Sequence, residues 1–236
     1  LRGLMDDAVR LRLISDVPLG GFLSGGLDST ILSSIATRLT DHHFHAYSVG
    51  YPQTGYHEFP FVEEAARTYG MHCRQIELAP RDYPGLWKFL IQQNGLPLST
   101  PNEVPIYMLS KSLRQDYTVA LSGEGADEVF GGYTISYFSG FDFNRASRLP
   151  VPAESMTDVD RAIQRGYGQN HLPDLASQHI LLNAWLTPAD KKAWMNPDLL
   201  HLLDGDAALH AYYAGLYDRH PHCSLLDRIL LAHLRI

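Results

Sequence analysis

The chain has 236 residues, of which 45% are hydrophobic, and a formal net charge of −7 at pH 7. This length allows one large core, or a core with a helical subdomain. An acidic balance without a basic cluster argues against nucleic-acid binding, and the lack of an apolar run of about 18 residues argues against a membrane span. Only two cysteines occur, Cys73 and Cys223, which favours a reducing, cytoplasmic setting over a secreted disulfide scaffold.

The first half of the chain alternates between predicted strands and predicted helices. We expect strands at residues 17–23, 44–49, 72–78 and 118–121, and helices at residues 4–13, 29–40, 58–69, 83–93 and 104–114. Helices of about 10 to 12 residues between strands indicate right-handed crossovers and a parallel sheet. The pattern therefore predicts an α/β fold with a doubly wound parallel sheet.

The strand signals stop after Tyr133. Helices are expected at residues 158–168, 175–186, 188–195 and 207–218, and a loop or boundary at residues 140–157 because Pro150 and Pro152 interrupt it. We therefore predict an α/β core over residues 1–139 and a helical extension of the same domain over residues 140–236.

The first motif, residues 24–29, reads Ser-Gly-Gly-Leu-Asp-Ser and follows the first predicted strand. Gly25 and Gly26 lack Cβ atoms, so backbone N–H groups can approach an anion closely. The following helix offers unpaired N–H groups and the positive end of its dipole, which favours phosphate. A carboxylate beside phosphates is repulsive without a cation between them, so Asp28 indicates Mg²⁺.

A plain alternative for this motif is a tight turn with a helix cap. The chain has no Gly-Lys pair and hence no Walker-type phosphate loop, and no G-x-G-x-x-G follows the first strand. The motif alone therefore leaves a nucleotide site and a structural turn both open.

The second motif, residues 122–133, favours the nucleotide site. It reads Ser-Gly-Glu-Gly-Ala-Asp-Glu-Val-Phe-Gly-Gly-Tyr and follows another buried-strand pattern at Val119-Ala120-Leu121. Glu124, Asp127 and Glu128 could form a solvated acidic loop. However, glycines crowd around these acids, and the carboxyl end of a central parallel strand faces the ligand crevice in such folds.

Together the two motifs resemble the synthetase domain of glutamine-dependent asparagine synthetases, which are class-II amidotransferases. The resemblance extends from about residue 4 to residue 133 and fades in the helical part. The first motif alone marks the wider group of ATP pyrophosphatases, which includes GMP and NAD synthetases. The resemblance implies an adenine-nucleotide alpha-hydrolase-like fold of the pyrophosphate-loop type.

The resemblance also implies an activity and a set of residues. A substrate carboxylate, typically the β-carboxylate of aspartate, is adenylated by ATP, and ammonia then displaces AMP to give asparagine. By motif, the implied ATP-binding residues are Leu23, Ser24, Gly25, Gly26, Asp28, Ser29, Val49, Ser122, Gly123 and Glu124. Asp28 and Asp127 are implied to bind Mg²⁺, and Glu124 to be catalytic by placing the adenylate and assisting proton removal from ammonia.

The chain departs from the family pattern at both ends and in one central segment. It lacks the N-terminal glutaminase domain that would supply ammonia, and residues 230–236 read as a helix that is cut short. We therefore expect a fragment of a longer polypeptide. The fragment alone could be inactive, and the protein could form a homodimer. At residues 98–103 the family carries an Arg facing aspartate, where this chain has Pro101. Ser99, Thr100 and Asn102 could still bind a substrate, while Glu103 would repel an anion or recognise an amine.

Three interpretations therefore remain open. The chain is an amide ligase that makes asparagine, a related ligase acting on another carboxylate (β-lactam-forming or sugar-amidating), or a non-catalytic nucleotide-binding relative. Two histidine groups, His42, His43 and His45 near one another and His220 and His222 beside Cys223, could bind a metal. Without second partners at suitable spacing, we interpret them as surface histidines. The aromatic residues of the helical part are interpreted as core rather than as a ligand cage: Trp185, Trp194, Tyr212, Tyr213 and Tyr217.

Overall fold

The structure is a computed structural model of the whole chain. It describes residues 1–41, 43–51, 58–148, 150–183, 186, 188–202 and 204–235, without the side chains of residues 135–137, 188 and 189. Of the residues considered above, His42, Trp185 and residue 184 of the helix expected at 175–186 lie outside the described residues. Of the aromatic residues expected in the core, Tyr217 is buried, whereas Trp194 and Tyr212 are 78% and 51% exposed, so the expectation is wrong for these two.

The chain forms two compact units, Leu1–Glu124 and Gly125–Ile236. The division falls inside the second motif, because the residues after Gly125 form a short helix that packs with the last helix of the chain. Residues 139 and 140, where the domain division was predicted, lie inside one helix. The assignment of residues 1–139 and 140–236 as core and extension stays a prediction.

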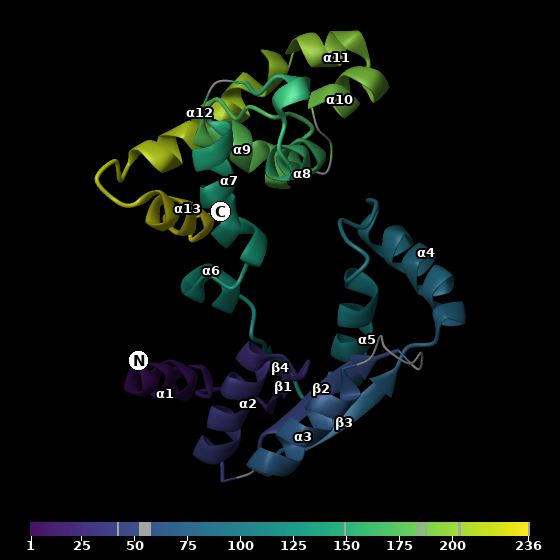
Figure 1. Cartoon of the computed structure of the whole chain (residues 1–236). Coiled ribbons are helices and arrows are strands. Elements are labelled where there is room, and N and C mark those ends of the chain that lie inside the picture. The colour runs from purple at the N-terminus through teal and green to yellow at the C-terminus, as the bar shows by residue number, and fades with distance from the viewer. Residues whose placement is uncertain are drawn as a thin grey trace. The chain divides into compact units, whose positions relative to one another are not determined.

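The first unit is built on a four-stranded parallel sheet (Figure 1). Its strands are β1 (Leu19–Phe22), β2 (His45–Gly50), β3 (His72–Glu77) and β4 (Val119–Leu121), in the order β3-β2-β1-β4. Leu19, Gly20 and Gly21 pair with Val119, Ala120 and Leu121, so β1 is an interior strand with β4 beside it. The buried, central position expected for β4 is wrong, because β4 lies at the edge of this four-stranded sheet and Val119 is 37% exposed. The predicted α/β fold with a parallel sheet is confirmed.

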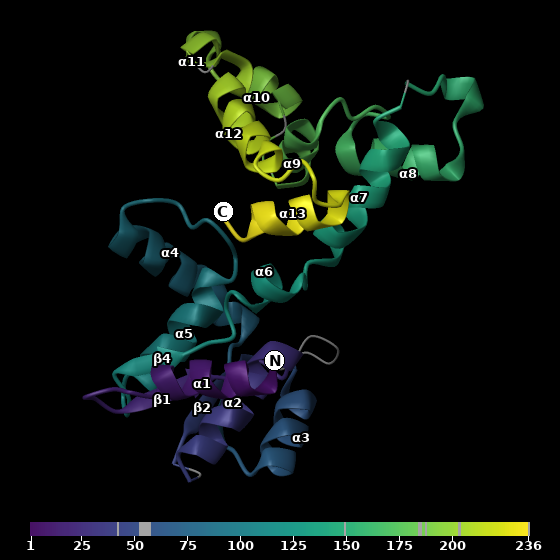
Figure 2. The ribbon, with the colours of Figure 1, turned by 90° about the vertical axis from the view of Figure 1, so that its left-hand side faces the viewer.

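Helices cover both faces of this sheet. The helices are α1 (Arg2–Arg12), α2 (Leu27–Leu39), α3 (Phe59–Tyr69), α4 (Tyr83–Asn94) and α5 (Glu103–Leu113), with a 3-10 turn at Pro80–Asp82. One apolar cluster joins Leu23, directly after β1, and Phe44, directly before β2, to Val62 of α3. A second joins Leu78 to Leu90 of α4 and Val104 of α5. Figure 2 shows α2 and α3 on one side of the strands and α5 on the other. All predicted strands and helices of this unit are found within a few residues.

The second unit is helical throughout the part that the structure describes. Its helices are α6 (Ala126–Phe130), α7 (Thr134–Ala146), α8 (Asp158–Tyr167), α9 (Leu175–Asn183), α10 (Pro188–Trp194), α11 (Pro197–Leu202), α12 (Ala207–Asp218) and α13 (Leu225–His233), with 3-10 turns at Ala153–Ser155 and Asp204–Asp206. The four helices expected after residue 157 are confirmed as α8, α9, α10 and α12.

The loop expected at residues 140–157 is wrong in its first half. Helix α7 continues to Ala146 because Phe143 and Ala146 face the apolar clusters of the unit, where Ala146 packs with Ile163 and Leu172. Pro150 and Pro152 follow the helix rather than interrupting it.

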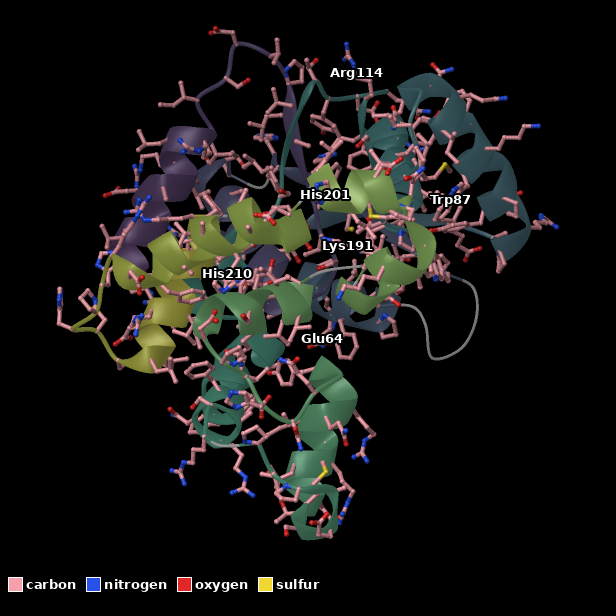
Figure 3. All side chains as sticks on the ribbon, turned by 90° about the horizontal axis from the view of Figure 1, so that it is seen from above. Glu64, Trp87, Arg114, Lys191, His201 and His210 are labelled. Carbon is pink, nitrogen blue, oxygen red and sulfur yellow. The ribbon has the colours of Figure 1, made fainter. Side chains whose placement is uncertain are left out.

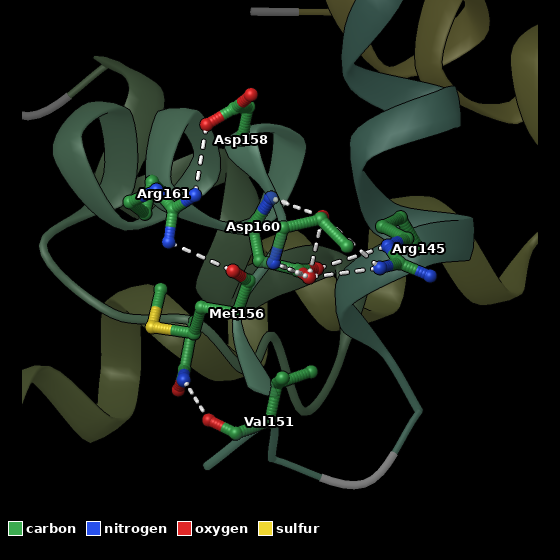
Figure 4. A network of polar contacts seen from close by, with 8 residues as sticks. Arg145, Val151, Met156, Asp158, Asp160 and Arg161 are labelled. Atoms are coloured by element: carbon green, nitrogen blue, oxygen red, sulfur yellow. Dashed lines mark hydrogen bonds and ion pairs between the residues drawn. The ribbon is translucent and has the colours of Figure 1, made fainter. Parts of the chain in front are cut away.

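A network of charged groups ties α7 to α8 (Figure 4). Arg145 donates two hydrogen bonds to the Asp160 carboxylate, Nε to Oδ1 at 2.9 Å and Nη2 to Oδ2 at 2.8 Å. Thr157 and Asp160 form a capping box at the start of α8, and the Thr157 hydroxyl also donates to Asp160 at 2.7 Å. Hydrogen bonds from Thr157 and Arg145 lower the pKa of Asp160 to about 2. These contacts fix α8 on α7.

Among the described helices, none has the length and apolar character to cross a membrane.

Candidate active site

The pairing of β1 with β4 brings the two motifs to the same edge of the sheet. Leu23 and Ser24 directly follow β1, and Ser122 directly follows β4. Because neighbouring parallel strands end at the same edge, the two loops leave the sheet together. Sequence reasoning predicted a strand before each motif, and the structure adds that the two strands are neighbours.

The loop after β1 is held by its own serines. The Ser24 and Ser29 hydroxyl oxygens lie 2.9 Å apart, and the Ser24 N–H donates to the Ser29 hydroxyl at 3.2 Å. The Gly26 N–H donates to the Ser24 hydroxyl at 3.2 Å. Ser29 is 8% exposed, whereas Ser24 is exposed. The two hydroxyls therefore shape the loop as well as offering donors to a ligand.

Gly25 lies where no other residue fits. Its φ is +84°, and a Cβ there would lie 2.8 Å from the Phe61 Cβ and 3.1 Å from the Val62 backbone nitrogen of α3. Both the backbone conformation and the close approach require glycine. The loop is therefore pressed against α3 at Gly25, while Ser24 and Gly26 are exposed.

The start of α2 faces this loop with uncapped donors. The cap residue is Gly26, which has no side chain to accept a first-turn N–H, and Asp28 lies half-buried in that first turn. The first N–H groups of a helix have no partner within it, and the helix dipole makes this end positive. An anion is favoured here, and the Asp28 carboxylate provides an oxygen ligand for a hard cation beside it.

Gly123 of the second motif lies directly against this helix start. A Cβ at position 123 would lie 3.0 Å from the Ser29 backbone nitrogen and 3.3 Å from the Asp28 Cβ. The two motifs thus meet backbone to backbone, and a larger residue at position 123 would press on the first turn of α2. Glu124, exposed at the end of this unit, donates its N–H to the Ser122 hydroxyl at 3.4 Å.

Two predicted nucleotide contacts belong to the apolar core. The Leu23 side chain is 1% exposed, and its N–H donates to the Tyr47 carbonyl at 2.9 Å. Val49 is half-buried against the cluster of Leu78, Leu90 and Val104. A nucleotide contact by Leu23 would therefore have to come from its backbone rather than its side chain.

The rest of the second motif lies in the helical unit, where Asp127 is held by its neighbours. A Cβ on Gly132 would lie 1.8 Å from the Asp127 Oδ1, and the Gly132 N–H donates to the Asp127 carbonyl at 2.9 Å. Tyr133 donates to Glu128 at 2.6 Å, and this hydrogen bond lowers the pKa of Glu128. Asp28 and Asp127 belong to different units, so their joint Mg²⁺ site stays a prediction.

The segment before α5 contains the tentative substrate residues. Glu103 accepts N–H groups from Ser99 at 2.5 Å and from Thr100 at 3.2 Å, and Tyr83 donates its hydroxyl to the Pro101 carbonyl. The carboxylate of Glu103 is thus used by its own loop, which sequence reasoning missed. The Thr-x-x-Glu spacing of a capping box was the available signal. Ser99 and Asn102 are exposed, and Thr100 is half-buried.

Polar side chains of the helical unit pair with one another. Lys191 donates to Asp206 at 2.6 Å, and the His210 Nε2 lies 2.9 Å from Asp174 Oδ1, with Lys191 and His210 labelled in Figure 3. Within the described ranges, no three His, Cys, Asp or Glu side chains gather closely enough to hold a metal ion by themselves.

Comparisons with known proteins identify the family. The family model for asparagine synthase matches residues 1–228. Asparagine synthetase [glutamine-hydrolyzing] 1 of Bacillus subtilis is 35% identical over 160 residues, which cover 66% of this chain and 24% of that protein. The probable asparagine synthetase of Schizosaccharomyces pombe is 29% identical over 209 residues, covering 78% of this chain and 34% of the relative.

The chain thus spans about a quarter to a third of the length of these relatives. The solved NH3-dependent NAD synthetase of Campylobacter jejuni aligns with 99% of this chain and 91% of its own, at 12% identity and a TM-score of 0.44. The family match covers nearly all of the chain and includes both motifs. The chain belongs to the asparagine synthase family.

Proposed function

We propose that this chain is the ATP-using part of an amide-forming ligase that adenylates a carboxylate, most simply the β-carboxylate of aspartate, and transfers ammonia to it. The observation that carries the proposal is the contact of Gly123 with the start of α2, where an added Cβ would lie 3.0 Å from the Ser29 nitrogen. This contact joins the two motifs into one surface of backbone donors, hydroxyls and a carboxylate.

In the first step, a substrate carboxylate oxygen attacks the α-phosphorus of ATP, and the bond between the α-phosphorus and the bridging oxygen of pyrophosphate breaks. Ser24, Ser29 and the first-turn N–H groups of α2 would hold the leaving pyrophosphate. A Mg²⁺ ion held by Asp28 and Asp127 would neutralise charge on the phosphates. The loop residues thus position the reactants and offset the charge that develops on the leaving group.

In the second step, ammonia attacks the acyl carbon, the carbon–oxygen bond to AMP breaks, and a proton leaves the nitrogen as the amide forms. Glu124 is exposed beside the loop of the second motif and would accept this proton. The ammonia would come from a glutaminase domain or from solution. The products would be the amide, AMP and pyrophosphate.

A different carboxylate substrate is the second candidate. Residues 98–103 contain no Lys, Arg or His to pair with an α-carboxylate. The one acidic side chain there, Glu103, is engaged by the N–H groups of Ser99 and Thr100. Ser99, Thr100 and Asn102 would then bind a neutral polar part of the substrate, as in amidation of a metabolite without a second anionic group.

Carboxylate-dependent exchange of labelled pyrophosphate into ATP tests both candidates in the full-length polypeptide. Exchange with aspartate supports asparagine formation, and exchange only with another acid keeps the mechanism and reassigns the substrate. A protein that binds Mg·ATP but exchanges with no acid on a broad panel would favour a non-catalytic nucleotide-binding role.

A further inference from the structure

Two histidines lie next to each other at the start of neighbouring strands in the first unit. His45 begins β2 and His72 begins β3, and the two are direct partners in the parallel register. Their ring centroids are 5.0 Å apart with the ring planes tilted by 48°. His72 is distant from His45 along the chain and reaches it only through strand pairing, so local spacing could not indicate this partner.

The separation of these rings suits a shared metal ion. A ligating imidazole nitrogen lies about 2.0–2.1 Å from zinc, so two rings that share one ion at a tetrahedral angle have centroids roughly 5 Å apart. Both histidines are exposed, so ions in solution can reach them. No hydrogen bond joins either imidazole to another side chain in the described part of the chain, which leaves their nitrogens available.

The surroundings are compatible with a cation. The Tyr117 ring lies 5.8 Å from the His45 ring, and next along the strands the Arg74 guanidinium is 3.7 Å from the Asp116 carboxylate. Asp116 also accepts the Tyr47 hydroxyl at 2.7 Å. The positive charge of Arg74 is thus offset by Asp116, so repulsion of a bound cation is reduced.

We propose that His45 and His72 form a binding site for a divalent transition-metal ion such as Zn²⁺, with the remaining ligand positions open to water. Neutral imidazole is a preferred ligand of such ions. Because β3 is an edge strand of the sheet, a bound ion pins it to β2. The site lies at the amino ends of these strands and is therefore separate from the loop that follows the carboxyl end of β1.

Zinc titration of the purified chain by calorimetry tests this site, with His45→Gln, His72→Gln and the double variant. Each single variant is expected to weaken zinc binding by about 10-fold or more, because the second imidazole binds as an intramolecular ligand. The double variant should fall to the background zinc binding of the rest of the chain, with a loss smaller than the two single losses combined. His43→Gln is the matched control, an exposed histidine two residues before the pair, and should bind zinc as the natural chain does.

A stability measurement distinguishes a joint site from two separate surface histidines. An ion that binds both strands only when they are paired stabilises the folded state, so zinc should raise the unfolding temperature of the natural chain but not of His45→Gln or His72→Gln. Metal-free circular dichroism checks that the variants fold. Unchanged zinc affinity in either single variant, or losses that simply add in the double variant, would overturn the proposal.

Discussion

The two units differ in whether their polar groups find hydrogen-bond partners within the protein. In the helical unit, buried polar side chains satisfy one another, as Asp160 does with Arg145 and Thr157. In the α/β unit, the loop after β1 is held by two serines and leaves the first turn of α2 without a side-chain cap. The first arrangement consumes hydrogen-bonding capacity within the protein, and the second leaves it for a ligand.

This difference separates polar clusters that hold a fold from those that bind something. Clustered acids and histidines occur in both units, so residue type does not distinguish them. The polar clusters differ in whether their hydrogen-bond partners are present. His179 contacts the Tyr217 hydroxyl of the same unit at 2.8 Å, whereas the first turn of α2, whose cap residue is Gly26, has no side-chain cap. The following predictions test this distinction, from the largest effect to the smallest.

Replacing Asp28 should have the largest effect and should act on chemistry alone. Asp28→Ala removes the carboxylate beside the start of α2 that we propose as a metal ligand, while the serines that hold the loop stay in place. We expect pyrophosphate exchange to fall by about 100-fold or more with an unchanged unfolding temperature. Exchange assays at several Mg²⁺ concentrations measure the loss.

Asp7→Ala is the matched control for this change. Asp7 is an exposed carboxylate on α1, so its removal alters net charge equally without touching the loop. Activity should be retained in this variant. If Asp28→Ala also kept full exchange, the assignment of Asp28 to the metal would be wrong.

The buried histidine of the helical unit should act on stability alone. His179 is 4% exposed and packs on the Tyr213 ring at 4.2 Å, and burial, with a smaller contribution from His233, lowers the pKa of His179 to about 4. The unfolded chain takes up a proton near pH 6.5, so this stability is complete above that pH and is lost as the pH falls towards 4. Between pH 7 and pH 5 the unit should lose about 2 kcal/mol.

Amide hydrogen exchange in α9, corrected for intrinsic rates, measures this loss locally. His179→Gln should remove most of the pH dependence, whereas His201→Gln, an exposed histidine of α11, should leave it unchanged. Burial also lowers the pKa of His233, so a smaller dependence of the same sign should remain. A full pH dependence in His179→Gln would show that another group carries it.

The sequence was sufficient for the parts that depend on local pattern. Strand and helix positions in the first unit followed from the alternation of strand and helix patterns along the sequence. Strand β4, which precedes the second motif, was expected from Val119-Ala120-Leu121. Asp28 was expected beside a helix start and lies there. These features depend on residues within about one element of each other.

The parts that depend on long-range contact could not be predicted. The approach of Gly123 to Ser29 and the pairing of His45 with His72 both depend on strand order. Helix α7 was missed because its stabilising contacts, through Phe143 and Ala146, are with helices that follow it in the chain. Prolines nearby signalled a loop that begins only after Ala146.

A substitution where the two motifs meet should have the smallest effect and is the sharpest test of their contact. In Gly123→Ala, the new Cβ would lie 3.0 Å from the Ser29 nitrogen and 3.3 Å from the Asp28 carbonyl carbon, so backbone must shift by a few tenths of an ångström. Such a displacement of the phosphate-facing N–H groups should lower pyrophosphate exchange by about 10-fold. Gly85→Ala on α4, where a Cβ meets nothing within 4 Å, is the matched control and should retain full activity. Because the shift moves donors rather than removing them, the loss should appear in the ATP concentration for half-maximal exchange while the unfolding temperature changes little. Equal exchange in both alanine variants would mean that the two motifs do not act as one surface.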